Sequence, residues 1–177
     1  MTNAKYYASL LLMGWALYAG MVKAADITLN FNATIVASPC EMDLTNSTTT
    51  IALGDVYANQ VETPGTRSGE VSFNLSFKDC PAGTTSVVAT FTGTDNPETF
   101  GGLTFLNAGT AENIGVQVKP LDGNWDAKSF HNGSTMTATV ADDKTAVFKL
   151  TSRMYTPTGN VTPGSVIATV TANFTYQ

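Results

Sequence analysis

The sequence is poor in the residues that build catalytic and metal sites. It has one histidine, His131, two cysteines and no C-x-x-C pair, so a four-ligand zinc site would lack soft ligands. No nucleophile–base arrangement surrounds the lone histidine. Asp122 and the neighbouring Asp142 and Asp143 match no calcium-loop spacing. We therefore expect no metal, no cofactor and no enzymatic activity.

Long apolar runs are also scarce, and the one present stands at the start of the chain. The run "ASLLLMGWALYA", residues 8–19, follows Lys5 and precedes a small-residue position at Ala24. This order is typical of a secretory signal cleaved after Ala24. A membrane anchor is the less favoured alternative, because a spanning helix needs roughly 20 apolar residues. We predict a signal peptide over residues 1–24 and an exported chain from Ala25.

Positive charge is sparse and unclustered. The chain has 9 Lys and Arg against 14 Asp and Glu. Removing Lys5 and Lys23 with the signal leaves 7 Lys and Arg, so the formal net charge of the exported chain is 7 − 14 = −7. A chain without a basic patch is not expected to bind nucleic acid.

Helical periodicity is missing beyond the signal, and short alternating or apolar runs separated by Gly, Pro, Asn and Asp take its place. This pattern favours a two-sheet antiparallel sandwich of the immunoglobulin-like type. The expected strands cover Thr50–Leu53, Glu70–Cys80, Ser86–Gly93, Leu103–Asn107, Ile114–Pro120, Ser134–Val140, Thr145–Tyr155 and Ser165–Gln177.

The two cysteines, Cys40 and Cys80, indicate one disulfide in an exported chain, and two free buried thiols are the alternative. True immunoglobulin domains carry a tryptophan between the bridged cysteines. Here Trp125 lies outside the loop, so different bracing is expected. Trp125 itself has two interpretations, a cap on the core or a platform for a sugar ring.

Both ends of the exported chain alternate. Residues 25–36 place Ile27, Leu29, Phe31, Ala33 and Ile35 on one face, with polar residues between them. The last strand places Val166, Ala168, Val170, Ala172, Phe174 and Tyr176 on one face and stops at Gln177. A strand at the very terminus stays ordered only if something pairs with it. Taken alone, the first strand would be expected to close its own sandwich.

Together these features resemble the pilus subunits of the periplasmic chaperone–usher route, and most of all the small adaptor subunits of type 1-like fimbriae. The resemblance covers the whole exported chain. It rests on the alternating arm before Cys40, the Cys40 and Cys80 pair with "CP" after it, the segment "TAENIGVQV" at residues 110–118, Gly164 fourteenth from the end, and the last strand with penultimate Tyr176.

The resemblance implies an incomplete immunoglobulin-like sandwich, the pilin fold, over residues 37–177. Such a subunit lacks its seventh strand, and the N-terminal arm of a neighbouring subunit fills the gap by strand addition. Residues 25–36 would then be a donor strand, with Ile27, Leu29, Phe31, Ala33 and Ile35 entering a neighbour. The acceptor groove and chaperone contact would involve Gly164, Val170, Phe174, Tyr176 and Gln177.

The partners implied by the resemblance are a periplasmic pilus chaperone, an outer-membrane usher and neighbouring subunits, in fimbriae on the bacterial surface that mediate adhesion. One departure concerns Ala33, where many arms of this family carry glycine, and it bears on which subunit accepts the arm. The position in the fibre (rod, tip adaptor or terminator) and any receptor stay open. The alternative function is a secreted carbohydrate-binding module with a complete sandwich.

Overall fold

The structure is a computed structural model, and it describes residue 32 and residues 39–97, 103–125 and 129–177. The chain divides into two units, Met1–Thr34 and Ile35–Gln177, and the second holds every described element. No helix in the described ranges is long and apolar enough to cross a membrane. The elements are β1 (Glu41–Met42), the 3-10 turn η1 (Ala58–Gln60), β2 (Val71–Lys78), β3 (Ser86–Gly93), β4 (Phe105–Leu106), β5 (Gly115–Pro120), β6 (Ser134–Thr139), β7 (Ala146–Tyr155) and β8 (Val170–Tyr176).

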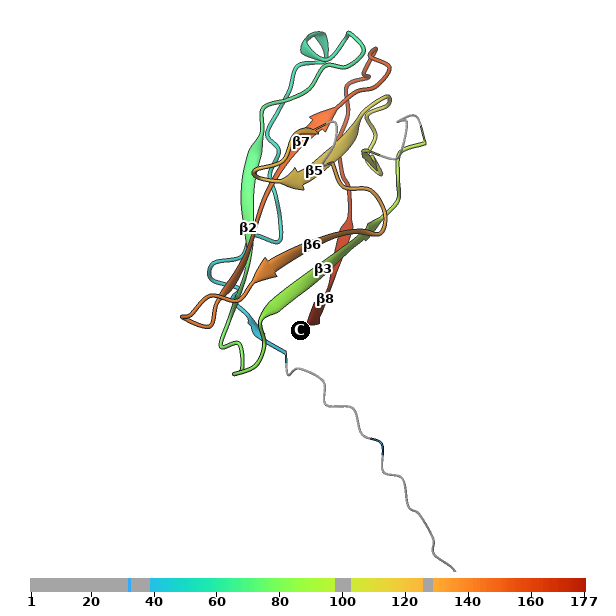
Figure 1. Cartoon of the computed structure of the whole chain (residues 1–177). Helices are drawn as coiled ribbons and strands as arrows, with labels where there is room; N and C mark the ends of the chain where they lie inside the picture. The colour runs from blue at the N-terminus through green and yellow to red at the C-terminus, as the bar shows by residue number, and fades with distance from the viewer. Residues whose placement is uncertain (1–31, 33–38, 98–102, 126–128) are drawn as a thin grey trace, which may run out of the picture. The chain divides into compact units, whose positions relative to one another are not determined.

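The strands form two antiparallel sheets. One has five strands in the order β1-β2-β7-β5-β4, and the other has three in the order β6-β3-β8. Strands distant in sequence lie side by side: β2 pairs with β7, and β8 returns to pair with β3. Figure 1 shows β2, β7 and β5 in one layer, with β6, β3 and β8 in the other. The all-β, two-sheet sandwich predicted from the sequence is confirmed.

The core lies between the sheets and follows from the alternation of side chains along each strand. Its residues come from both layers, and each has less than about a tenth of its surface exposed. They include Leu75, Phe77, Val87, Ala89, Phe91, Val116, Val118, Phe148 and Leu150. On β7, for example, Phe148 and Leu150 are buried, while the alternate residues Val147 and Lys149 are exposed.

Most expected strands are found. Strand β3 has the predicted bounds, and the others are shorter than predicted at one or both ends. The segment Thr50–Leu53 is different, because the structure has no strand there. The segment that follows β1 is hydrogen-bonded to β2 as far as Thr48, whose N–H donates to Asn74 O at 2.9 Å. Its alternating residues then have no described strand beside them with which to form a ladder. The alternation therefore predicted correctly which side chains face inward, but the strand inferred from it is absent.

The last strand is also shorter than expected. It was predicted over Ser165–Gln177, whereas β8 begins at Val170. The preceding residues are held by a loop instead. Ala108 N–H donates to Ile167 O at 2.7 Å, and Ile167 N–H donates to Asn107 Oδ1 at 2.7 Å. A side chain thus replaces one backbone partner, and the ladder is interrupted.

Candidate strand-accepting groove

Strand β8 has one bonded edge and one open edge. At its end, Gln177 N–H donates to Ser86 O at 2.9 Å and Ser86 N–H donates to Gln177 O at 3.0 Å. Antiparallel ladders alternate bonded and non-bonded pairs, so the even-numbered residues of β8 direct their backbone groups away from β3. Within the described ranges no strand lies on that side. Such an edge is a template for an additional strand.

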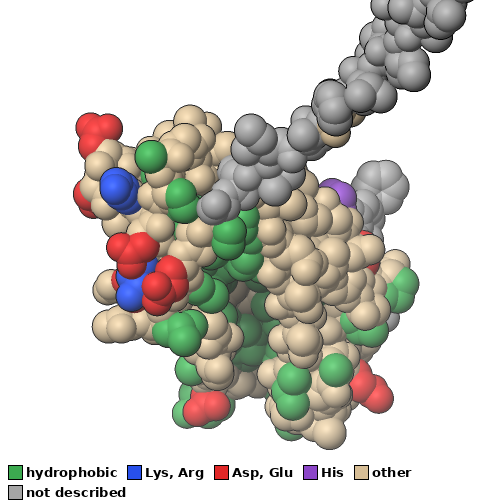
Figure 2. Space-filling model, turned by 90° about the horizontal axis from the view of Figure 1, so that it is seen from below, with side chains coloured by type: hydrophobic (Ala, Val, Ile, Leu, Met, Phe, Trp, Pro, Cys, Tyr) green, Lys and Arg blue, Asp and Glu red, His purple; other side chains and the backbone are tan. Residues whose placement is uncertain are grey.

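A groove of about 1170 Å³ runs beside this open edge. One wall is the segment 48–58 that was expected to contain a strand, and the other is residues 161–170 with Ala172 and Phe174 of β8. The buried floor comes from strands of both sheets and from the loop segments near them: Val61, Leu75, Phe91, Ala111, Ile114, Val116, Val118, Ser152 and Met154. Figure 2 shows hydrophobic side chains gathered in this hollow.

The groove is apolar and nearly uncharged. Among its described lining residues only Asp55 carries a charge. The inward residues of the last strand and its approach, from Val166 to Tyr176, pack against the core cluster yet stay half-buried. A completed sandwich buries both inner faces of its sheets. The groove is therefore the place where this core lacks its cover.

The structure brings together three of the residues expected at the groove. Gly164, Val170 and Phe174 line it. Tyr176 does not line it and instead packs edge to face on Phe77, with ring centroids 6.2 Å apart. Burial raises the pKa of Tyr176 above its usual range. Its ring therefore belongs to the core beyond the end of the groove.

Gly164 is required by a close approach of two backbones. A Cβ at this position would lie 2.5 Å from Ala111 N and 2.7 Å from the carbonyl carbon of Thr110. Contacts this short between a Cβ and backbone atoms are not tolerated in folded proteins. The glycine thus lets residues 164–167 lie against the 107–111 loop at one end of the groove.

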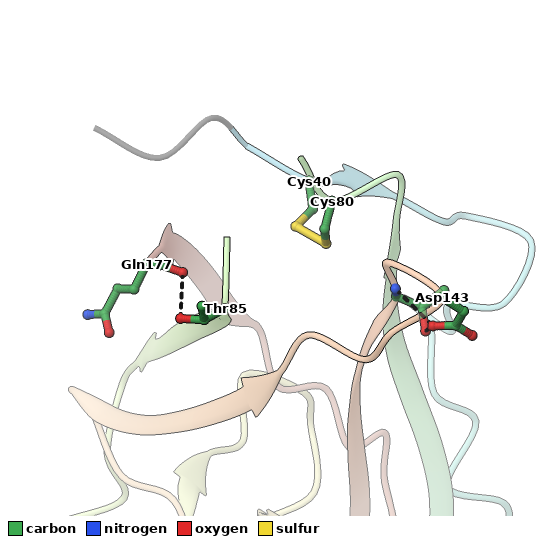
Figure 3. Close-up of a disulfide and its surroundings, with 6 residues drawn as sticks. Cys40, Cys80, Thr85, Asp143 and Gln177 are labelled. Atoms are coloured by element: carbon green, nitrogen blue, oxygen red, sulfur yellow. Dashed lines mark hydrogen bonds between the residues drawn. A yellow bond between two sulfur atoms is a disulfide. The ribbon is translucent and has the colours of Figure 1, made fainter. Parts of the chain in front are cut away.

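The chain end is fixed by β3. The carbonyl oxygen of Gln177 accepts hydrogen bonds from Thr85 N–H at 2.5 Å and Ser86 N–H at 3.0 Å. It also accepts one from the Thr85 hydroxyl at 3.2 Å, as Figure 3 shows. The terminal residue is therefore held at a defined place, which a partner that binds the carboxylate would need. Chaperone binding by Gln177 stays a prediction.

The disulfide between Cys40 and Cys80 is present, with a sequence separation of 40. Both cysteines are buried, at 6% and 1% exposure. They join the residue before β1 to a residue just after β2, two strands that pair directly. Figure 3 shows the bridge close to the end of the sandwich where β8 terminates. This confirms the pairing expected for an exported chain.

The predicted donor residues Ile27, Leu29, Phe31, Ala33 and Ile35 lie outside the described residues, so their role stays a prediction. Two parts of the groove were missed by the sequence analysis. In the wall at residues 48–58, the sequence predicted a short strand over Thr50–Leu53 and gave no indication that the segment borders a groove. Ser152 on the floor gave no signal, because a serine in a strand of mixed character is not distinctive.

Trp125 takes part in a cluster on the outer face of the five-stranded sheet. The guanidinium carbon of Arg153 lies 3.9 Å from its ring centroid, and Lys119 Nζ lies 4.7 Å from it. Its indole N–H donates to Glu70 Oε1 at 2.6 Å. Lys119 and Arg153 are 4% and 5% exposed. The tryptophan therefore covers two buried cations, which favours the structural interpretation over a sugar platform.

The residues considered for catalysis or metal binding are not brought together. Within the described ranges, no group of three or more His, Cys, Asp or Glu side chains is placed to hold a metal ion. His131 is exposed. Asp143 accepts hydrogen bonds from Thr145 N–H and from the Thr145 hydroxyl, at 3.1 and 2.7 Å, and so closes a turn (Figure 3).

Comparison with known proteins identifies the family. A family model described as "Fimbrial protein" matches residues 29–177. The chain belongs to the fimbrial protein family. It is thus a structural pilus subunit of a non-enzymatic family, as the sequence predicted.

Individual relatives agree with the family match. Protein FimG of Escherichia coli K12 is 33% identical over 163 residues, covering 92% of each chain. YdeR of the same strain, described as an uncharacterized fimbrial-like protein, is 34% identical over 164 residues, again covering 92% of each. Among solved structures, the P pilus rod subunit PapA matches with a TM-score of 0.56 at 19% identity. That match covers 85% of this chain and 99% of PapA, and it shows a shared pilin fold.

Proposed function

We propose that this fimbrial subunit polymerises by donor-strand exchange. Its groove accepts the N-terminal arm of one neighbouring subunit, and its own residues 25–36 enter the groove of another. The observation that carries the proposal is the half-buried apolar face from Val166 to Tyr176 beside the open edge of β8. An inserted strand would pair with the open backbone edge of β8, and its alternate side chains would cover the half-buried apolar face.

The free energy of burial expected for the arm supports a stable contact between subunits. The inward face of the arm carries four large apolar residues, Ile27, Leu29, Phe31 and Ile35. At about 1.5–3 kcal/mol for each buried side chain, burial contributes roughly 6–12 kcal/mol gross. Hydrogen bonds along the edge add to this, and a groove that is already formed reduces the ordering cost. The arm would therefore hold far more firmly than a contact at an interface rim.

The same groove explains the expected partners. An apolar hollow beside an unpaired edge is prone to aggregation, so a periplasmic chaperone strand is expected to occupy it before assembly. Delivery to an outer-membrane usher would then place the subunit in a surface fibre that mediates adhesion. The ordered chain end at Gln177 offers the chaperone a fixed carboxylate.

The proposal is tested by co-expressing the chain with its cognate chaperone, with and without residues 25–36. Loss of polymer together with retention of the chaperone complex is the expected result, because the groove remains while the donor is gone. Normal polymerisation of the shortened chain would exclude donation by this arm.

A matched pair of arm variants separates the inward face from chain length. Phe31→Asn and Leu29→Asn together should abolish polymer, since polar side chains would enter an apolar groove. Thr28→Ala and Asn30→Ala alter the opposite face of the same arm and should leave polymer yield nearly unchanged. The alternative, a complete carbohydrate-binding module, requires instead a stable monomer that no donor peptide stabilises.

A further inference from the structure

Ser152 is a polar exception on the floor of the groove. It lies on β7 between Leu150 and Met154, with Val71 of β2 and Val118 of β5 as its register partners. It lines the groove and is 3% exposed. Of the buried residues in the described lining, it alone is polar.

The Ser152 hydroxyl has no hydrogen-bond partner in the described part of the chain. The next side chains on the same face of β7, Leu150 and Met154, are apolar, and the backbone of β7 at this position is paired with β2 and β5. A buried hydroxyl without a partner is unfavourable, because it has given up its hydrogen bonds to water. Because Ser152 is part of the groove lining, a strand bound there can supply the missing partner.

We propose that the strand accepted by this groove carries a serine or threonine at the inward position that faces Ser152. This inference rests on the donor-strand function proposed above and specifies the chemistry of the donor. A hydroxyl both donates and accepts, so it pairs with another hydroxyl in either direction. A charged side chain would be too costly to bury in a floor that is otherwise apolar.

The proposal distinguishes this chain's own arm from other donors. Every inward residue of that arm, Ile27, Leu29, Phe31, Ala33 and Ile35, lacks a hydrogen-bonding side chain. A second copy of this chain would therefore leave Ser152 without a partner. The preferred donor is a different subunit, which makes the chain a link between unlike neighbours rather than a self-repeating unit.

The test uses ten peptides copied from residues 27–35, each with either Thr or the similarly shaped Val at one of the five inward positions. The exported chain, Ala25–Gln177, is prepared with its groove blocked by a displaceable peptide, and relative affinities are measured by competition. The same measurements are made on the Ser152→Ala variant. Using the ratio of Thr to Val affinity within each protein cancels any general effect of the substitution on folding.

At one position, the ratio of Thr to Val affinity should be about threefold to tenfold higher in the wild-type chain than in Ser152→Ala. At the other four positions the two proteins should give equal ratios. The wild-type chain alone supplies a second readout, because Thr should be tolerated at that one position and should weaken binding elsewhere.

Equal ratios at all five positions would overturn the role of Ser152, even if every peptide binds. Displacement of all five Thr peptides by the unmodified arm peptide would overturn the preference for a different subunit. A chain that binds none of the peptides would contradict donor-strand exchange itself, which keeps the two proposals distinguishable.

Discussion

Phe77 of β2 and Phe174 of β8 meet edge to face, with ring centroids 4.7 Å apart and ring planes at 67°. The two strands belong to different sheets, so this contact joins the layers. Phe77 is 2% exposed, whereas Phe174 is half-buried and also lines the groove. One aromatic pair thus connects the groove wall to the core.

Truncating this contact should weaken the sandwich. We expect Phe174→Ala to lower the free energy of unfolding by about 3 kcal/mol, at the low end for a core Phe because the ring is half-buried. The measurement is urea unfolding of the chain saturated with one donor peptide. Thr175→Ala, on the exposed face of the same strand, is the control and should change stability by less than about 0.5 kcal/mol. Similar losses in both variants would contradict the interpretation.

The disulfide should contribute chiefly by restricting the unfolded chain. A closed loop of this length, with a sequence separation of 40, corresponds to about 4 kcal/mol on the chain-entropy estimate. Reduction should therefore lower the urea midpoint of the wild-type chain. The Cys40→Ala and Cys80→Ala double variant should start at the lower midpoint and show no response to reductant. A wild-type midpoint unaffected by reduction would count against this contribution.

Adding a methyl group at Gly164 should disturb the end of the groove. The new Cβ would press on the backbone of Thr110 and Ala111, and forced overpacking typically costs about 1–3 kcal/mol. We expect Gly164→Ala to lower both stability and affinity for a donor peptide. Gly69→Ala is the matched control, because nothing lies within 4 Å of a Cβ there. An unchanged peptide affinity in Gly164→Ala would show that the loop can move aside.

Trp125 should stabilise the outer face of the five-stranded sheet without affecting the groove. Trp125→Ala would remove the aromatic cover from two nearly buried cations and should cost at least about 2 kcal/mol. Trp125→Phe keeps a ring face but loses the hydrogen bond to Glu70, so a smaller loss is expected. Peptide affinity should be equal in all three proteins. A stability loss no greater in the Ala than in the Phe variant would argue against the stacked cations.

Most strands of this fold could be predicted from the sequence, and the predictions that failed have a common cause. The alternation in Glu70–Cys80 and Thr145–Tyr155 located β2 and β7, because alternate residues of both strands face the core and both strands are paired on two edges. The same alternation in Thr50–Leu53 misled, since the pattern reports which side chains face inward and does not report whether a neighbour is present to bond the backbone. Likewise, parity placed Val170, Phe174 and Tyr176 on one face, but it did not show that Val170 and Phe174 line the groove whereas Tyr176 packs on Phe77 nearer the chain end.

The sequence alone determined the class of this protein: a strand-rich chain with one disulfide and an alternating apolar face in the segments near each end. These features depend on local periodicity and composition, which a linear chain carries by itself. The three-dimensional fold decided where the core stays uncovered, because that depends on which strands pair across long separations. It also decided that a lone serine hydroxyl lies on the floor of the gap, since the partner of a buried polar group depends on what the fold places around it.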